Sequence, residues 1–117
     1  MSQLEARQAF ETLLATLPSD AYTIRADYEN SKKLEIRRSY GSPKVVLVWS
    51  SNGLDNEFTT RTEYAAKLSQ WFPGFSAEPS KPQYSRTFSI TASQLNATIA
   101  NNKTDIAAAI VAIDQSR

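Results

Sequence analysis

The chain has 117 residues, of which 41% are hydrophobic and 21% charged, with a formal net charge of +1 and neither cysteine nor histidine. This length predicts a single domain over residues 1–117, because a chain of this size supports one hydrophobic core. The missing histidine and cysteine exclude Ser-His-Asp and Cys-His catalysis and the zinc sites that these residues build.

The near-neutral charge excludes a global field that would attract nucleic acid or anionic lipid, so any charged function must come from a local patch. No apolar run approaches the roughly 20 residues of a membrane span. The N-terminal segment carries Glu5 and Glu11, which a signal peptide would not. We therefore expect a cytoplasmic protein without membrane contact, as the lack of cysteine also suggests.

The first half of the chain predicts one helix and three strands. Leucine and phenylalanine at near-helical spacing predict a helix over 3–17, and alternating apolar and polar residues predict strands over 22–28 and 33–40. The run KVVLVWSS at 44–51 starts with a block of β-branched residues, which predicts a central strand covered on both faces.

In the second half, the segment SSNGLDNEF is predicted to be a loop, and Thr60 and Glu63 have the spacing of a helix-capping box. A helix is predicted over 61–72, a loop over 75–83, a strand over 84–91, and two helices over 92–100 and 105–115. The order is α-β-β-β-α-β-α-α. We expect a single-domain α+β fold with helices packed on a mostly antiparallel four-stranded sheet.

Charge pairing predicts the register of the first two strands. Asp27 opposite Lys33 and Arg25 opposite Glu35 place opposite charges across the ladder. A shift of two residues would oppose like charges, and a shift of one would turn the apolar residues to opposite faces. This register also pairs the inward residues, Ala26 with Leu34 and Ile24 with Ile36.

Five side chains around the second strand stay unexplained by this pairing: Lys32, Arg37, Arg38, Tyr40 and Lys44. They are candidate phosphate- and base-contacting residues of a nucleic-acid-binding surface. The alternative is a solvated sheet face whose lysines prevent edge pairing. Arg38 alternates inward, so we expect it to reach solvent along its stem or to pair with a carboxylate.

The element order, with Asp27 followed by Glu35-Ile36-Arg37, resembles the restriction-endonuclease-like nucleases and their Asp…Glu-x-Lys metal site. The resemblance implies Mg²⁺ held by Asp27 and Glu35. Arg37 stands where that family has lysine, and the acids fall on the first two strands rather than the second and third. The order also resembles that of the small dimeric secretion chaperones.

Every residue between Asp105 and Asp114 is apolar, so the last helix must be covered all round. Its cover is either the first and the preceding helix or a second copy of the chain. Trp71 and Phe75 flank another helix end, where they either pack on the sheet or form a contact patch. The candidate interface residues are Ile106, Ala109, Ile110, Ile113, Trp71 and Phe75.

The sequence thus favours a non-catalytic binding or adaptor protein that acts through a protein–protein surface, as a homodimer with one further protein partner. We expect no enzyme activity, no cofactor and no metal site. The first alternative is a nucleic-acid-binding module that uses the basic residues of the hairpin. The second is a metal-dependent nuclease.

Overall fold

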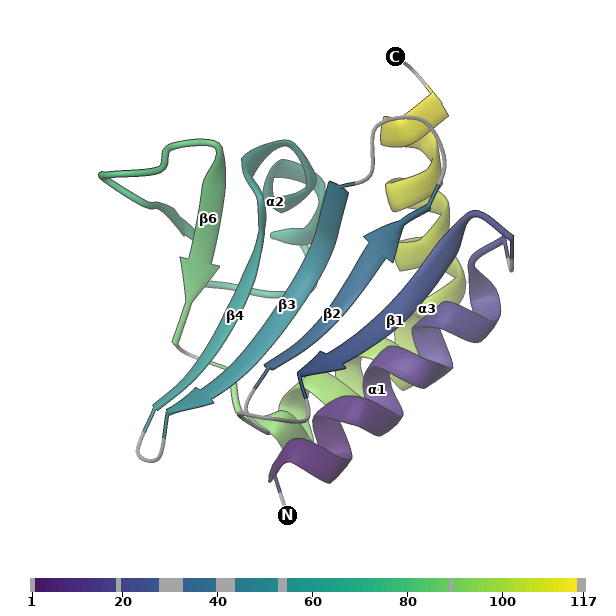
Figure 1. Ribbon diagram of the computed structural model, residues 1–117, viewed down its shortest axis with the longest axis horizontal. Helices are drawn as coiled ribbons and strands as arrows, with labels where there is room; N and C mark the ends of the chain where they lie inside the picture. Colours follow the sequence, from purple (N-terminus) through teal and green to yellow (C-terminus); the bar gives the residue numbers. More distant parts are fainter. Residues whose placement is uncertain are drawn as a thin grey trace.

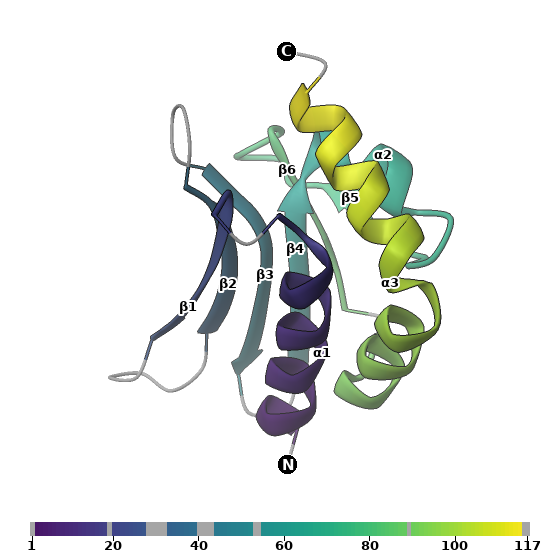
Figure 2. The same cartoon turned by 90° about the vertical axis from the view of Figure 1, so that its right-hand side faces the viewer.

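The computed structural model describes residues 2–18, 20–27, 33–39, 44–52, 55–88 and 90–115. Within them the chain forms an α+β domain with an antiparallel six-stranded sheet and three helices, α1 (Ser2–Thr16), α2 (Thr62–Leu68) and α3 (Ala92–Gln115). Figure 1 looks onto the sheet, and Figure 2 shows the helices on one side of it. No described helix covers the opposite face of the sheet, which we call the open face. None of the described helices is long and apolar enough to cross a membrane.

The sheet has the strand order β1-β2-β3-β4-β6-β5, and each neighbouring pair is antiparallel. Its strands are β1 (Tyr22–Asp27), β2 (Lys33–Arg38), β3 (Lys44–Asn52), β4 (Asp55–Arg61), β5 (Ser76–Ala77) and β6 (Tyr84–Thr87). The predicted α+β class and antiparallel sheet are confirmed. The predicted count of four strands is wrong, because β4 and β5 lie in segments that the sequence assigned to loops.

Strand β4 forms a hairpin with β3, in which Asn52 pairs with Asp55. The loop prediction failed here because Phe58 is the one strongly apolar residue of the strand, which is otherwise polar. The capping-box prediction is also wrong. Thr60 lies within β4, and its buried hydroxyl group donates to the Val46 carbonyl oxygen at 2.6 Å.

The register predicted for β1 and β2 is confirmed at all four predicted pairs, from Ile24 opposite Ile36 to Asp27 opposite Lys33. Between β2 and β3 the register shifts after Ile36, so that Val46 has no partner across the ladder. Such a bulge leaves backbone groups of the extra residue without ladder bonds. The Thr60 hydroxyl group satisfies one of them, the Val46 carbonyl.

Strand β3 was predicted to be covered on both faces, and the described helices cover one of them, since they all lie on one side of the sheet (Figure 2). Leu47 and Trp49 point toward the helices and are buried. Val48 alternates onto the open face, yet its side chain is only 9% exposed. Neighbouring side chains on that face therefore shield it from solvent.

The core lies between the sheet and the helices and is centred on Phe58. Its ring centroid lies 5.0 Å from that of Phe72 and 6.4 Å from those of Phe10 and Trp49. Helices α1 and α3 lie side by side in both views. Helix α3 is kinked at Asn102, whose backbone leaves the helical region, and this break divides the two helical segments that the sequence predicted.

Candidate functional site

A buried charged cluster is centred on Asp114, one residue before the end of α3. The side chain of Asp114 has no exposed surface. The Tyr22 hydroxyl group donates to its Oδ2 at 2.5 Å, and the Tyr64 hydroxyl group donates to its Oδ1. The guanidinium group of Arg38 also donates to Oδ1, from Nη1 at 3.2 Å. Elements β1, β2, α2 and α3 thus meet at one carboxylate.

The charges and hydrogen bonds of this cluster indicate that Asp114 positions the elements that meet at it. A buried carboxylate is tolerated when an opposite charge and hydrogen bonds replace its lost hydration, and here Arg38 and two hydroxyl groups do so. Burial, together with the hydrogen bond to Asp114 and its negative charge, raises the pKa of Tyr64 well above its ordinary value. Tyr64 therefore keeps its proton and remains a donor at neutral pH. A substrate could not reach the buried carboxylate without movement of the surrounding elements.

The contact between Tyr64 and Asp114 joins α2 to the C-terminal half of α3, which lie beside each other in Figure 2. These two elements, with the turn that follows α2, form the walls of a groove of about 660 Å³. The cluster therefore fixes the spacing of the groove walls. We call this feature the α2–α3 groove.

The α2–α3 groove is mainly apolar and has a polar rim. Helix α3 contributes small residues and one isoleucine, and the turn after α2 contributes a half-buried tryptophan. The rim carries both signs of charge, with Lys67 and Gln70 on one wall and Asp105 on the other. The apolar lining residues are Ala108, Ala109, Ala112, Ile113 and Trp71.

Three of the six predicted interface residues line this groove: Trp71, Ala109 and Ile113. Ile106 and Ile110 are instead buried in the core, on the side of α3 that packs within the chain. Phe75 packs against Phe58, with ring centroids 5.7 Å apart. The apolar helix is thus covered partly by its own chain, and its remaining surface faces the groove.

Two of the five predicted nucleic-acid-binding residues have described side chains, and these two lie on opposite sides of the sheet. Arg37 lies on the open face of the sheet, opposite Val45, whereas Arg38 points inward to Asp114. Lys44 is the first residue of β3. Lys32 and Tyr40 lie outside the described residues.

Two other arginine side chains on the open face, Arg61 and Arg86, contact carboxylates. Arg61 Nε lies 2.8 Å from Glu63 Oε1. Arg86 Nη1 lies 2.9 Å from Glu78 Oε1 and 3.6 Å from Glu57 Oε2. A phosphate backbone would have to compete with these carboxylates, which weakens the open face as a polyanion surface.

The predicted nuclease residues lie on neighbouring strands. Glu35 has Arg25 and Val48 as its cross-strand partners, and Asp27 pairs with Lys33. Over the described ranges of the chain, no cluster of three or more acidic, histidine or cysteine side chains suited to a metal ion is found.

Comparison with protein-family profiles, with curated proteins and with solved structures finds no match to this chain.

Sequence reasoning missed Tyr22, Tyr64 and Asp114 as a set, although one signal pointed to them. Strand alternation turned Arg38 inward, and pairing with a carboxylate was one of its two predicted outcomes. That outcome is confirmed by the contact with Asp114. The strand pattern does not say which acid an inward arginine would meet.

Proposed function

We propose that this protein is a non-catalytic binding protein that forms a homodimer through the α2–α3 groove and acts through protein–protein surfaces. The observation that carries the proposal is the groove itself, with its apolar lining of Trp71, Ile113 and alanines. Apolar hollows with an aromatic anchor are typical of the centres of protein interfaces. Small side chains on α3 allow a second helix to approach closely.

The occupant that fits best is a second copy of the chain. In a two-fold symmetric contact, every contact occurs twice. If a residue i of one copy contacts a residue j of the other, residue j of the first copy also contacts residue i of the second. Lys67 and Asp105 lie on opposite walls of the same groove. A two-fold axis along the groove would therefore give two equivalent pairs, each between the lysine of one copy and the aspartate of the other.

The buried cluster supports the same proposal because it preorganises the groove. The bond from Tyr64 to Asp114 holds α2 against α3 before any partner arrives. A preformed site loses less conformational freedom on binding. Dimerisation on this side would leave the open face of the sheet uncovered on both copies, where a further protein partner could bind.

The nucleic-acid alternative has less support. Of the five residues that suggested it, Arg37 lies on the open face and Arg38 is held by Asp114. Neighbouring arginine side chains at Arg61 and Arg86 already have carboxylate partners. The nuclease alternative also lacks a second described carboxylate directly across a strand from Glu35.

The test is the oligomeric state of the purified protein over a concentration series, measured by light scattering. The wild type should reach a particle of twice the 13.0 kDa chain mass. Ala112→Glu should give a folded monomer, because Ala112 is exposed on the groove wall and the new charge would be buried in the interface. Ala109→Glu should act in the same way.

The matched control is Ala100→Glu, at another exposed alanine of α3, one that does not line the groove. It should leave the dimer intact. A monomeric wild type would overturn the proposal, and so would an Ala112→Glu protein that still dimerises. Circular dichroism of each variant separates loss of assembly from loss of folding.

A further inference from the structure

The open face of the sheet carries a hollow of about 260 Å³ between β3, β4, β6 and the turn after β5. This hollow lies on the side of the sheet opposite the helices, so it does not depend on the proposed dimer. Its floor is apolar, formed by Val45 and Val48. Val48 is 9% exposed although no described helix covers this face. The side chains around the hollow therefore shield Val48 from solvent and form the walls of the hollow.

Paired charges hold these walls in place. Arg86 Nη1 contacts Glu57 Oε2 at 3.6 Å and Glu78 Oε1 at 2.9 Å, which ties the turn after β5 to β4. The Thr59 hydroxyl group donates to Glu57 Oε1 at 3.0 Å, so both oxygen atoms of Glu57 are engaged. The Arg61 guanidinium group lies 5.5 Å from the centre of the Tyr84 ring and supports that wall.

Two charged groups at the mouth of the hollow stay available. Lys81 is exposed, and across the described part of the chain no carboxylate pairs with it. The Oε1 atom of Glu78 contacts Arg86, which leaves Oε2 free to accept a bond. Both residues belong to one tight turn, in which the Lys81 N–H group donates to the Glu78 carbonyl oxygen at 3.3 Å.

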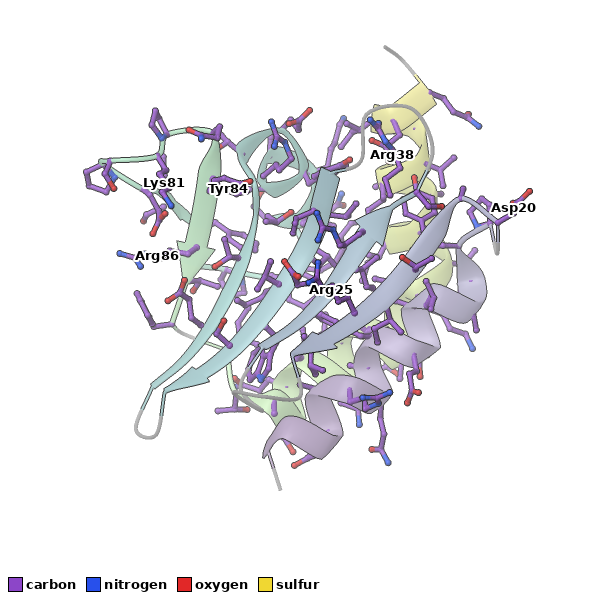
Figure 3. The ribbon with its side chains drawn as sticks, viewed as in Figure 1. Asp20, Arg25, Arg38, Lys81, Tyr84 and Arg86 are labelled. Carbon is purple, nitrogen blue, oxygen red and sulfur yellow. The ribbon has the colours of Figure 1, made fainter. Side chains whose placement is uncertain are left out.

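The same turn is fixed to β6 by a second bond, from the Tyr84 N–H group to the Lys81 carbonyl oxygen at 2.9 Å. Figure 3 shows Lys81, Tyr84 and Arg86 together on the β6 side of the open face. The lining of the hollow thus combines the Lys81 ammonium group and the Glu78 carboxylate, which come from one turn, with two valine side chains of β3. This combination is complementary to a small zwitterion with an apolar body.

We propose that this hollow binds a free α-amino acid with an aliphatic side chain. The ligand carboxylate accepts hydrogen bonds from Lys81, and the ligand ammonium group donates to Glu78 Oε2. The side chain lies on Val45 and Val48 and is flanked by Tyr84. In ligand sites, a small number of polar groups fix the orientation of the ligand while apolar side chains contact its body; here the lining is mostly polar and the two valines supply the apolar contact.

The test is a titration of ¹⁵N-labelled protein with L-leucine, followed by two-dimensional NMR. Saturable shifts should be confined to residues 45–50, 57–59 and 78–84, with a dissociation constant on the order of 1 mM for so small and shallow a site. N-acetyl-L-leucine lacks the ammonium group, and L-leucine amide lacks the carboxylate. Each should bind about tenfold more weakly than L-leucine, since each loses a hydrogen bond to a charged group.

Variants distinguish the two ends of the site. Lys81→Met and Glu78→Gln should each raise the dissociation constant for L-leucine about tenfold. Glu57→Gln also disturbs the contact with Arg86 but removes no free oxygen, so its effect should be smaller than that of Glu78→Gln. Lys103→Met, at an exposed site on α3, should have no effect.

Three outcomes would overturn the assignment. The first is the absence of saturable shifts around the hollow. The second is equal binding of L-leucine and either blocked analogue, which would mean that one charge alone is recognised. The third is unchanged affinity in Lys81→Met.

Discussion

The Tyr64 hydroxyl group donates a hydrogen bond to the Asp114 carboxylate, and this contact joins α2 to the end of α3 across fifty residues of sequence. Arg38 and Tyr22 bind the same carboxylate from β2 and β1. The carboxylate therefore links both helical walls of the α2–α3 groove to the first two strands. Its removal should affect folding and assembly together.

Asp114→Ala should lower the free energy of unfolding by about 3–5 kcal/mol, because it leaves the Arg38 charge largely buried without its partner. Urea denaturation followed by circular dichroism measures this loss. Asp20→Ala, at an exposed aspartate before β1, is the control and should change stability by less than about 0.5 kcal/mol. Equal stabilities of the two variants would mean that the cluster contributes nothing.

Tyr64 should make stability depend on alkaline pH. Its pKa in the folded protein is raised, first by burial and then by the hydrogen bond to Asp114 and its charge. An unfolded tyrosine has a pKa of about 10, so above that pH the unfolded chain holds fewer protons than the folded one. The stabilisation is complete below pH of about 10 and is lost as the pH rises further, by up to roughly 1.4 kcal/mol per pH unit.

The measurement is the slope of unfolding free energy against pH above about 10, where other groups also titrate. Tyr64→Phe should reduce this slope. Tyr84→Phe, on the open face of the sheet, is the matched control and should keep it. The comparison rests on slopes, since Tyr64→Phe also removes a buried hydrogen bond and lowers stability at every pH. Identical slopes in the two variants would contradict the assigned role of Tyr64.

The β1–β2 hairpin was predictable because two independent patterns agree in it. Apolar alternation fixed which side chains face inward, and the charges of Arg25 and Glu35 fixed the pairing between strands. Strand β4 lacks the first pattern, because Phe58 is its one strongly apolar residue, and its backbone pairs with β3 and β6 regardless. A half-polar strand between two others is defined by its neighbours, which local sequence does not reveal.

The candidate site shows the same limit. The partners of Asp114 lie 92, 76 and 50 residues away in the chain, so no local motif connects them. The apolar run of the last helix did predict a surface in need of cover. It did not predict how the run divides, with Ile106 and Ile110 buried in the core and Ala112 exposed at the groove. That division follows from the tertiary packing of α3 against α1 and α2.

Charge exchange across the groove provides a direct test of the two-fold arrangement. Lys67→Glu alone, or Asp105→Lys alone, would place like charges opposite each other at both symmetric positions of the dimer. Each single variant should raise the dimer dissociation constant about five- to thirtyfold, since two modest surface pairs become repulsive. The double variant restores opposite charges and should return the constant to near the wild-type value.

Sedimentation equilibrium of the four proteins at low and high ionic strength measures these constants. The differences should shrink at high salt, where the Debye length falls to about 3 Å at 1 M. If the two substitutions act independently, the dissociation constant of the double variant should be at least as high as that of either single variant. That result would mean that Lys67 and Asp105 are not in contact in the dimer, and it would exclude the proposed two-fold axis. A return of the dissociation constant to near the wild-type value would mean that the two residues contact each other across this axis.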